Sequence, residues 1–499
     1  MKDFLSLGML LIMFVGFAQN NAFLNRGYWS TNTSVADVQK TIAEGNDPTE
    51  RNAGGFDATV LAINSKAPME TIKYLLSIEG NPVDKMTHDG RNYLMWASFQ
   101  GNYELVQYLI SQGSDVRWKD DKGNDIITYT ATGGNTDPKL YELYKSHGFV
   151  LKNSTRNGAN ALLLAAPSIS DLQELKYFID NDMQLADVDE QGNNVFHMVA
   201  TKGNTTVMQQ LMNAGIDAHA VNKVVENALF MAAKGARGHS NGLEVFQFLA
   251  EQKINPLQKD SQGNTLMHVL AMRNSDWSIF EYFATLGLDM NSLNHNNETP
   301  YLLALKNNNE KVLNALYAVN KDFALSTKDG HTALSYAVMS HNAEQVQKLI
   351  DSKQNLMVTN QDGATLMQLL IENYNPRKSK EFERIFAILS DANVGVSPTQ
   401  NNGNNLYHTV VVKNHVNLIS YLKSLNLDIN QRNDEGLTPL HLAAMKATDL
   451  NTIKTLLQNG ADPKIKTEFG EDITELVMEN ELLDVSENDL KSLTLVNKL

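Results

Sequence analysis

The sequence predicts an all-α fold in which short helix-turn-helix units stack into a solenoid. The first observation is a series of glycines, most of them 33 to 35 residues apart. Two gaps, of 71 and 67 residues, are about twice this unit, and Val225 and Asn297 stand where the missing glycines would lie. Self-similarity at such a period is the signature of a stacked repeat array. The glycines of the series, called the turn glycines below, are Gly55, Gly90, Gly123, Gly158, Gly192, Gly263, Gly330, Gly363, Gly403, Gly436 and Gly470.

The second observation is the pattern within one period, for example residues 87–119. Gly90 permits a left-handed backbone in a turn, and Asn92 is suited to cap the helix that follows. Leu105 and Leu109 belong to the apolar stripe of a second helix, which ends at Gly113. An extended return then leads into the next turn. We expect about twelve such units, joined by short β-hairpin turns.

The ends of the array differ from its interior. Residues 35–45 predict a lone second helix, so that about 35–52 form a half-unit N-terminal cap after an extended segment, 19–34. The last unit, 468–499, is rich in carboxylates and predicts a polar C-terminal cap, as a solenoid end exposed to water requires. Residues 35–499 are therefore expected to form a single domain.

Two units have lengthened connections between their helices, at 235–242 and 373–380. Insertions in repeat proteins map to loops, and loops often carry function, although tolerated variation in length is the simpler explanation of such insertions.

The unit resembles the ankyrin repeat. Residues 436–444 read Gly-Leu-Thr-Pro-Leu-His-Leu-Ala-Ala, and residues 456–462 read Leu-Leu-Gln-Asn-Gly-Ala-Asp. Parts of this pattern recur in other units, so the resemblance covers about residues 35–499. It implies a solenoid that binds other proteins through its hairpin tips and its concave face. Because fold does not determine function, the partner stays unidentified.

The first 18 residues predict a secretory signal peptide. Lys2 provides a positive start, residues 4–17 are mostly apolar, and Gly16 and Ala18 place small residues before a cleavage site at Gln19. The apolar run is shorter than the roughly 20 residues of a membrane span, although a retained anchor or a buried first helix stays open. The chain contains no cysteine. An exported protein without cysteine fits the bacterial periplasm or medium, with no membrane insertion after cleavage.

Composition and motifs argue against several other functions. The net charge of −15 disfavours nucleic acid as a partner. Phosphate-loop, nucleophile-elbow and zinc-helix motifs do not occur, so we expect no enzyme, no cofactor and no metal. Four histidines recur at one position of the unit, which places them about 10 Å apart in a stack, too far to share one ion. The resemblance implies a structural role for these four, His197, His268, His408 and His441.

Two groups of residues are candidate partner-binding sites. Six units place a cation after the alanines of the first helix, where ankyrin proteins line the concave face. The favourable interaction of cations with a helix C-terminus explains these positions without any partner. The second group consists of Phe99 and Trp118, because aromatic residues are enriched at interfaces. Trp96, in contrast, is expected in the core. The six cations are Lys202, Lys234, Arg273, Lys306, Lys413 and Lys446.

The sequence thus favours a non-enzymatic, monomeric scaffold that binds another protein in the bacterial periplasm or outside the cell. The alternative is a secreted effector or toxin-neutralising protein that acts on another cell.

Overall fold

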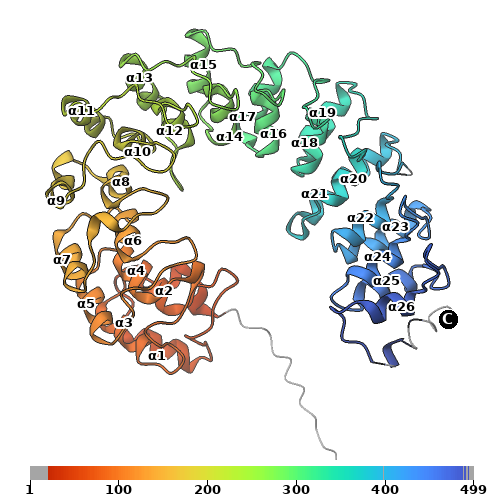
Figure 1. The fold of residues 1–499 in the computed structure, drawn as a ribbon, viewed down its shortest axis with the longest axis horizontal. Helices are drawn as coiled ribbons and strands as arrows, with labels where there is room; N and C mark the ends of the chain where they lie inside the picture. Colours follow the sequence, from red (N-terminus) through yellow and green to blue (C-terminus); the bar gives the residue numbers. More distant parts are fainter. Residues whose placement is uncertain (1–20, 397, 487, 491–492, 494–499) are drawn as a thin grey trace, which may run out of the picture. The chain divides into compact units, whose positions relative to one another are not determined.

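The computed structural model describes residues 21–396, 398–486, 488–490 and 493 (Figure 1). The predicted signal peptide, residues 1–18, lies outside these ranges. The chain divides into two compact units, Met1–Lys223 and Val224–Leu499, called unit 1 and unit 2 below. The division falls beside Val225, in a turn that lacks its glycine. None of the described helices is long and apolar enough to cross a membrane.

Each repeat consists of a first helix, which follows the turn, and an antiparallel second helix. In unit 1 the first helices are α2 (Ala58–Asn64), α4 (Tyr93–Phe99), α6 (Ile126–Thr132), α8 (Ala161–Ala165) and α10 (Val195–Ala200). The second helices are α3 (Met69–Leu76), α5 (Tyr103–Ser111), α7 (Pro138–Ser146), α9 (Lys176–Asp180) and α11 (Thr205–Asn213).

Unit 2 continues the same alternation. Its first helices are α12 (Ala228–Lys234), α14 (Leu266–Arg273), α16 (Pro300–Lys306), α18 (Ala333–Met339), α20 (Leu366–Glu372), α22 (Leu406–Val412), α24 (Pro439–Lys446) and α26 (Ile473–Glu479). Its second helices are α13 (Leu243–Glu251), α15 (Trp277–Thr285), α17 (Glu310–Val319), α19 (Ala343–Asp351), α21 (Ser379–Asp391), α23 (Ile419–Leu422) and α25 (Asn451–Gln458). The described residues therefore hold twelve complete helix pairs followed by α26, which confirms the predicted fold class.

Within each unit the first helices pack on one another in one layer, and the second helices form a layer behind them (Figure 1). The alanines of the first helices are fully buried, as Ala232, Ala304 and Ala443 illustrate. Small side chains at these positions let successive helices approach closely. Leucines of the second helices, such as Leu109 and Leu349, are buried between the layers. The hydrophobic core therefore runs along each unit, and every repeat covers its neighbour.

The turns are hairpin-like but contain no strand in the described part of the chain, where only isolated bridges such as Val188 to Asn194 occur. A typical turn closes with hydrogen bonds from the Thr87 N–H to the Arg91 carbonyl, 2.8 Å, and from the Gly90 N–H to the Thr87 carbonyl, 3.0 Å. One such closure is too short to form a strand ladder.

Successive turns are joined by backbone hydrogen bonds within each unit. The Asp121 N–H donates to the Asp89 carbonyl in unit 1, and the Gln361 N–H donates to the Asp329 carbonyl in unit 2, both at 3.0 Å. Bonds of this kind join most successive turns and hold their tips in register.

The two positions that lack a turn glycine keep the glycine backbone. Val225 has a φ of 65° and Asn297 a φ of 58°, close to the values of the turn glycines. Asparagine tolerates this left-handed region, whereas a β-branched valine is strained there. The turn geometry is therefore imposed by the repeat and not by the residue.

The recurring Thr-x-x-His pattern is a capping box. Thr438 accepts a hydrogen bond from the backbone of His441, and the His441 side chain reaches back to the Thr438 N–H. Each partner satisfies a backbone or side-chain group that would otherwise be unpaired at the start of α24. Asn194 with His197 and Asn405 with His408 repeat the arrangement.

The two lengthened connections adopt different structures. Residues 235–242 form a small turn, in which Ala236 bridges to His239 and Asn241 is buried. Residues 373–380 form a 3-10 turn (Pro376–Lys378) and then the start of α21. The second insertion thus lengthens a helix as well as a loop.

The first described residues are not extended as expected. Two 3-10 helices, Ala22–Leu24 and Arg26–Tyr28, place Phe23 and Trp29 in the core, where the rings stack 5.7 Å apart. The lone second helix is present as α1 (Val35–Ala43), which packs on α3. Burial of two large aromatic side chains accounts for the compact segment before it.

Candidate functional site

The six cations predicted after the first helices occupy two different positions of the repeat. Lys234 and Lys306 lie nine residues after the turn positions Val225 and Asn297, at what we call the first helix-end position. The second helix-end position is the next residue. It carries Lys202, Arg273, Lys413 and Lys446, all exposed.

The cations at the first helix-end position have internal partners. Lys234 forms an ion pair with Glu226, and Lys306 Nζ lies 3.1 Å from Glu298 Oε1. Both glutamates directly follow the turn position, and only 6% of each of their side chains is exposed. These two lysines therefore neutralise buried carboxylates.

Glu298 has further hydrogen-bond donors. Tyr336 of the next repeat donates its hydroxyl at 2.9 Å, and Asn294 donates its amide at 2.9 Å. Burial raises the pKa of Glu298, but the hydrogen bonds from Asn294, Lys306 and Tyr336 outweigh it and hold the pKa below its ordinary value. Burial and the same carboxylate raise the pKa of the Tyr336 hydroxyl. The cluster is a fixed, charged element that joins two repeats.

The cations at the second helix-end position point to no buried carboxylate. Lys202 of unit 1 donates to the Ser168 hydroxyl at 2.8 Å. Arg273, Lys413 and Lys446 of unit 2 are exposed at the ends of α14, α22 and α24. Lys306 is also exposed, but its charge is paired with Glu298, so the second set offers a partner the cations that no buried glutamate engages.

Phe99 and Trp118 are both half-buried in unit 1, and Phe99 belongs to an aromatic cluster with Tyr129 and Trp96. The Phe99 ring lies 4.9 Å from the Tyr129 ring, and Trp118 Nε1 donates to the Gly90 carbonyl at 2.7 Å. Trp96 is buried as expected, 5.9 Å from Tyr129. Both candidate residues keep an exposed edge while their other side packs on the fold.

Arg91 is a member of this cluster that sequence reasoning missed. Its Nε donates to Asp120 at 2.9 Å, and its guanidinium lies 4.5 Å from the Tyr129 centroid. Arg91 directly follows a turn glycine, at the same position as Glu226 and Glu298. The signal that could have identified it is therefore the alignment of the residues that follow the turns, most of which are polar and buried.

The four recurrent histidines bond to neighbouring backbone. Their Nε2 atoms lie 3.0 Å from the Ala220 carbonyl for His197, 2.9 Å from Glu298 for His268, 3.0 Å from Leu437 for His408 and 2.8 Å from Ile465 for His441. Burial lowers the pKa of His268, His408 and His441. In the described part of the chain, no three histidine or carboxylate side chains are grouped closely enough to hold a metal ion.

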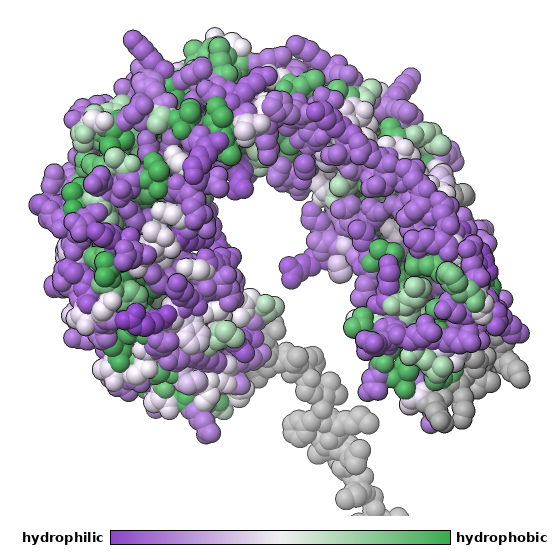
Figure 2. All heavy atoms as spheres, in the orientation of Figure 1, coloured by the Kyte–Doolittle hydropathy of each residue, from purple (hydrophilic) through white to green (hydrophobic). Residues whose placement is uncertain are grey.

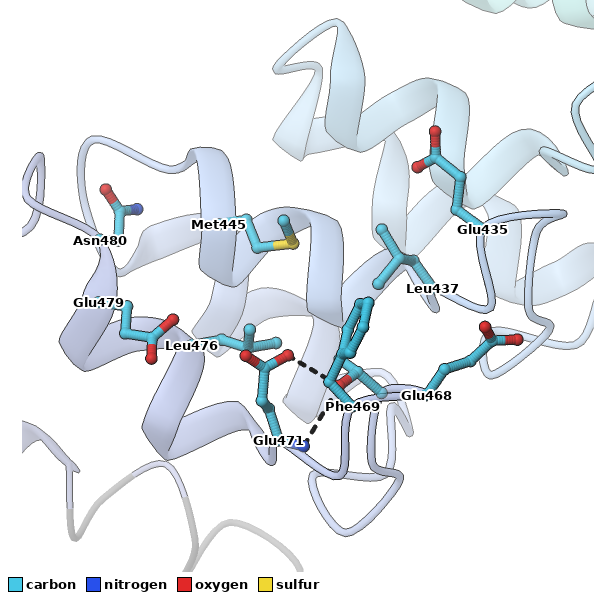
Figure 3. A pocket seen from close by; sticks show the side chains of 10 residues that line it. Glu435, Leu437, Met445, Glu468, Phe469, Glu471, Leu476, Glu479 and Asn480 are labelled. Atoms are coloured by element: carbon cyan, nitrogen blue, oxygen red, sulfur yellow. Dashed lines mark hydrogen bonds between the residues drawn. The ribbon is translucent and has the colours of Figure 1, made fainter.

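A pocket of about 490 Å³ lies between the last two turns of unit 2 and the ends of α24 and α26 (Figure 3). Its apolar lining comes from Leu437, Met445, Phe469 and Leu476. Phe469 is 91% exposed, and Met445 is 46% exposed. The surface is largely hydrophilic in the space-filling view, and apolar residues are exposed on it in this region of the C-terminal repeats (Figure 2).

Carboxylates flank this apolar lining on two sides. Glu471 and Glu479 lie on one side, and Glu435 and Glu468 lie on the other (Figure 3). The described lining contains no lysine or arginine. Glu471 accepts a hydrogen bond from the Thr467 hydroxyl at 2.8 Å.

Sequence reasoning treated the carboxylates of residues 468–499, which include Glu471 and Glu479, as a solvated cap and missed the pocket. The signal was Phe469, which precedes a turn glycine where most repeats carry a polar residue or glycine.

Comparison with known proteins identifies the repeat. A family model described as "Ankyrin repeats (3 copies)" matches residues 30–120, 94–191, 267–362 and 356–467, well over half of the chain. The chain is similar to the solved human ASB11 ankyrin repeat domain, with 17% identity and a TM-score of 0.38, and to the ankyrin repeat domain of Bcl-3, with 18% identity and a TM-score of 0.36. Each likeness covers 46% of this chain and 98% of the other. Both TM-scores are low, and the family assignment depends on the sequence match alone.

Proposed function

The chain belongs to the family of ankyrin repeat proteins, and on this premise we propose that it is a non-enzymatic scaffold that binds another protein. One observation carries the proposal: side chains are exposed at the helix ends and turn tips. Backbone hydrogen bonds between successive turns hold these side chains in register. Such repeated, rigid presentation suits a large protein surface, and affinity would come from a few anchors on it.

The surface cations of unit 2 are the proposed partner contacts of that unit. Arg273, Lys413 and Lys446 are exposed, whereas Lys234 and Lys306 are engaged by glutamates. In unit 1, Phe99, Trp118 and Lys202 provide the corresponding candidates. We take Lys234 and Lys306 to act indirectly, because they hold the turns that carry the surface.

The test begins with capture of the partner from the native envelope fraction by cross-linking and its identification by mass spectrometry. Binding of the purified partner is then measured for R273E/K413E/K446E. We expect at least a ten-fold loss of affinity with a nearly unchanged melting temperature. The matched control reverses three exposed lysines beside or on the second helices, K253E/K311E/K380E. Equal affinities of the two triple variants would contradict the role of the helix-end cations.

We also propose that the scaffold is exported as a monomer and acts in the bacterial periplasm or outside the cell. Support comes from the predicted signal, with Lys2, the apolar residues 4–17 and the small residues before Gln19, and from the lack of cysteine. Cell fractionation separates the possibilities. Recovery from the periplasm supports the scaffold, recovery from the medium or from neighbouring cells supports the effector alternative, and recovery from the cytoplasm refutes export.

A further inference from the structure

We propose that the C-terminal pocket of unit 2 binds a basic segment of a partner protein, with one large apolar side chain seated between lysine or arginine residues. This inference rests on the proposed scaffold function and specifies the chemistry of one of its contacts. The relevant observation is the pocket lined by Leu437, Met445, Phe469 and Leu476 and flanked by four glutamates (Figure 3).

Comparison with earlier repeats shows that the described lining of this pocket lacks a lysine that pairs with a glutamate. In two earlier repeats, the residue after the turn position and the residue eight places later form an ion pair, Glu226 with Lys234 and Glu298 with Lys306. In the last repeat the same two positions hold Glu471 and Glu479. A glutamate thus replaces the lysine, and both carboxylates line the pocket.

At these two positions the preceding repeat provides apolar residues of the pocket lining. There the residues are Leu437 and Met445, so neither charge is present. Consecutive repeats therefore place an apolar pair beside a doubly acidic pair. Phe469, which is 91% exposed, completes the apolar lining from the tip of the last turn.

Charge complementarity selects the occupant. Two carboxylates on either side of an apolar centre favour a segment with cations on both sides of a large apolar residue, and an acidic segment would be repelled. The volume of about 490 Å³ is in the range of small binding sites, and desolvation of Phe469 and Met445 would favour the complex.

The direct test uses fluorescence anisotropy with the full chain and a labelled nine-residue peptide that has a central leucine between two lysines on each side. We expect saturable binding that weakens as salt is added. Replacement of the central leucine by glycine, or of the lysines by glutamates, should weaken binding at least ten-fold. Equal binding of the glutamate peptide would overturn the proposal.

Variants of the pocket give the second arm. Phe469→Ser and E471Q/E479Q should each lower affinity for the lysine peptide about ten-fold. The control E481Q/D484N removes the same charge from exposed residues of the same repeat outside the pocket and should leave affinity unchanged. K446E, which removes a nearby cation, should not weaken binding. Loss in the control equal to loss in E471Q/E479Q would refute a specific pocket.

Two further outcomes distinguish this proposal from the others. If the wild-type chain forms a dimer that Phe469→Ser dissociates, as judged by analytical ultracentrifugation, a second copy occupies the pocket and the proposal is wrong. If the pocket variants bind the purified partner as tightly as the wild type, the pocket proposal fails while the scaffold stands. If no protein is captured, the scaffold proposal fails, and the peptide measurement still reports on the pocket.

Discussion

Lys306 Nζ lies 3.1 Å from Glu298 Oε1, eight residues earlier in the same repeat, and Tyr336 of the next repeat donates to the same oxygen at 2.9 Å. The pair connects the end of α16 with the turn before it. A surface lysine at a proposed binding position is thus part of the framework that holds the turns.

The first prediction concerns this ion pair. Lys306→Met should lower the free energy of unfolding by about 1–2 kcal/mol, because a buried carboxylate loses its cation. Exposed Lys311→Met in the same repeat should change it by less than about 0.5 kcal/mol. Urea denaturation and hydrogen exchange of α16 measure both.

The same pair should depend on pH. The pKa of Glu298 in the folded chain is lowered from 4.5. The ionised carboxylate therefore stabilises the fold above that pH, and this stabilisation is lost as the pH falls below it. The effect of Lys306→Met should therefore shrink between pH 7 and pH 3.5. An undiminished effect at low pH would show that lost packing, not charge, explains the variant.

The second prediction concerns Val225, whose φ is 65°. Val225→Gly should stabilise the turn by about 0.5–1 kcal/mol, since the relief of left-handed strain exceeds the entropy cost of glycine. Val221→Gly, at an exposed position that is not among those with positive φ, should destabilise instead. Slower hydrogen exchange in α12 is the expected readout, and faster exchange in Val225→Gly would refute the strain.

The third prediction uses a natural substitute for the recurrent histidine. Gln368 occupies the position of His408, accepts from the Thr365 N–H at 2.8 Å and donates to the Asn404 carbonyl at 3.2 Å. Replacing His268, His408 and His441 together by glutamine should therefore preserve most of the stability at pH 7.5.

The pH dependence of that variant follows from the direction of the shifts. Burial lowers the folded pKa of the three histidines below 6.5, so the unfolded chain binds more protons in this range and stability falls as the pH drops below about 6.5. The glutamine variant should lose less stability than the wild type between pH 7.5 and pH 5.5 in urea titrations. Identical losses would assign the pH dependence to other groups.

The fourth prediction concerns the first 18 residues. Expression of the full chain in a bacterium should yield a mature protein that begins at Gln19, because the small residues Gly16 and Ala18 suit signal peptidase cleavage. Intact mass spectrometry measures the difference. Ala18→Leu should slow cleavage, and an uncut wild-type chain in the envelope would instead indicate a retained anchor.

Much of the fold could be predicted because the repeat encodes it many times. Turn glycines, capping residues and buried alanines recur at fixed positions. The absence of a turn glycine from one repeat, as at Val225, is therefore compensated by the pattern of the other repeats. The same alignment placed His441 and the other recurrent histidines too far apart to share one ion, and the resemblance to the ankyrin repeat implied their structural role. The candidate surface was harder to predict, because the alignment placed the cations of two adjacent positions in one class.

The sequence by itself determined the helix-turn-helix unit, its period, helix caps such as Asn92 and the left-handed turn positions, because these depend on local backbone preference and apolar spacing. Only the tertiary structure separated the cations that pair with a buried glutamate from those that do not, since Lys306 and Tyr336 of the next repeat both bond to Glu298. It alone also brought Phe469, Met445 and the glutamates around one pocket. Side chains from different repeats become neighbours only when the repeats stack, and no local pattern records which of them then remain exposed.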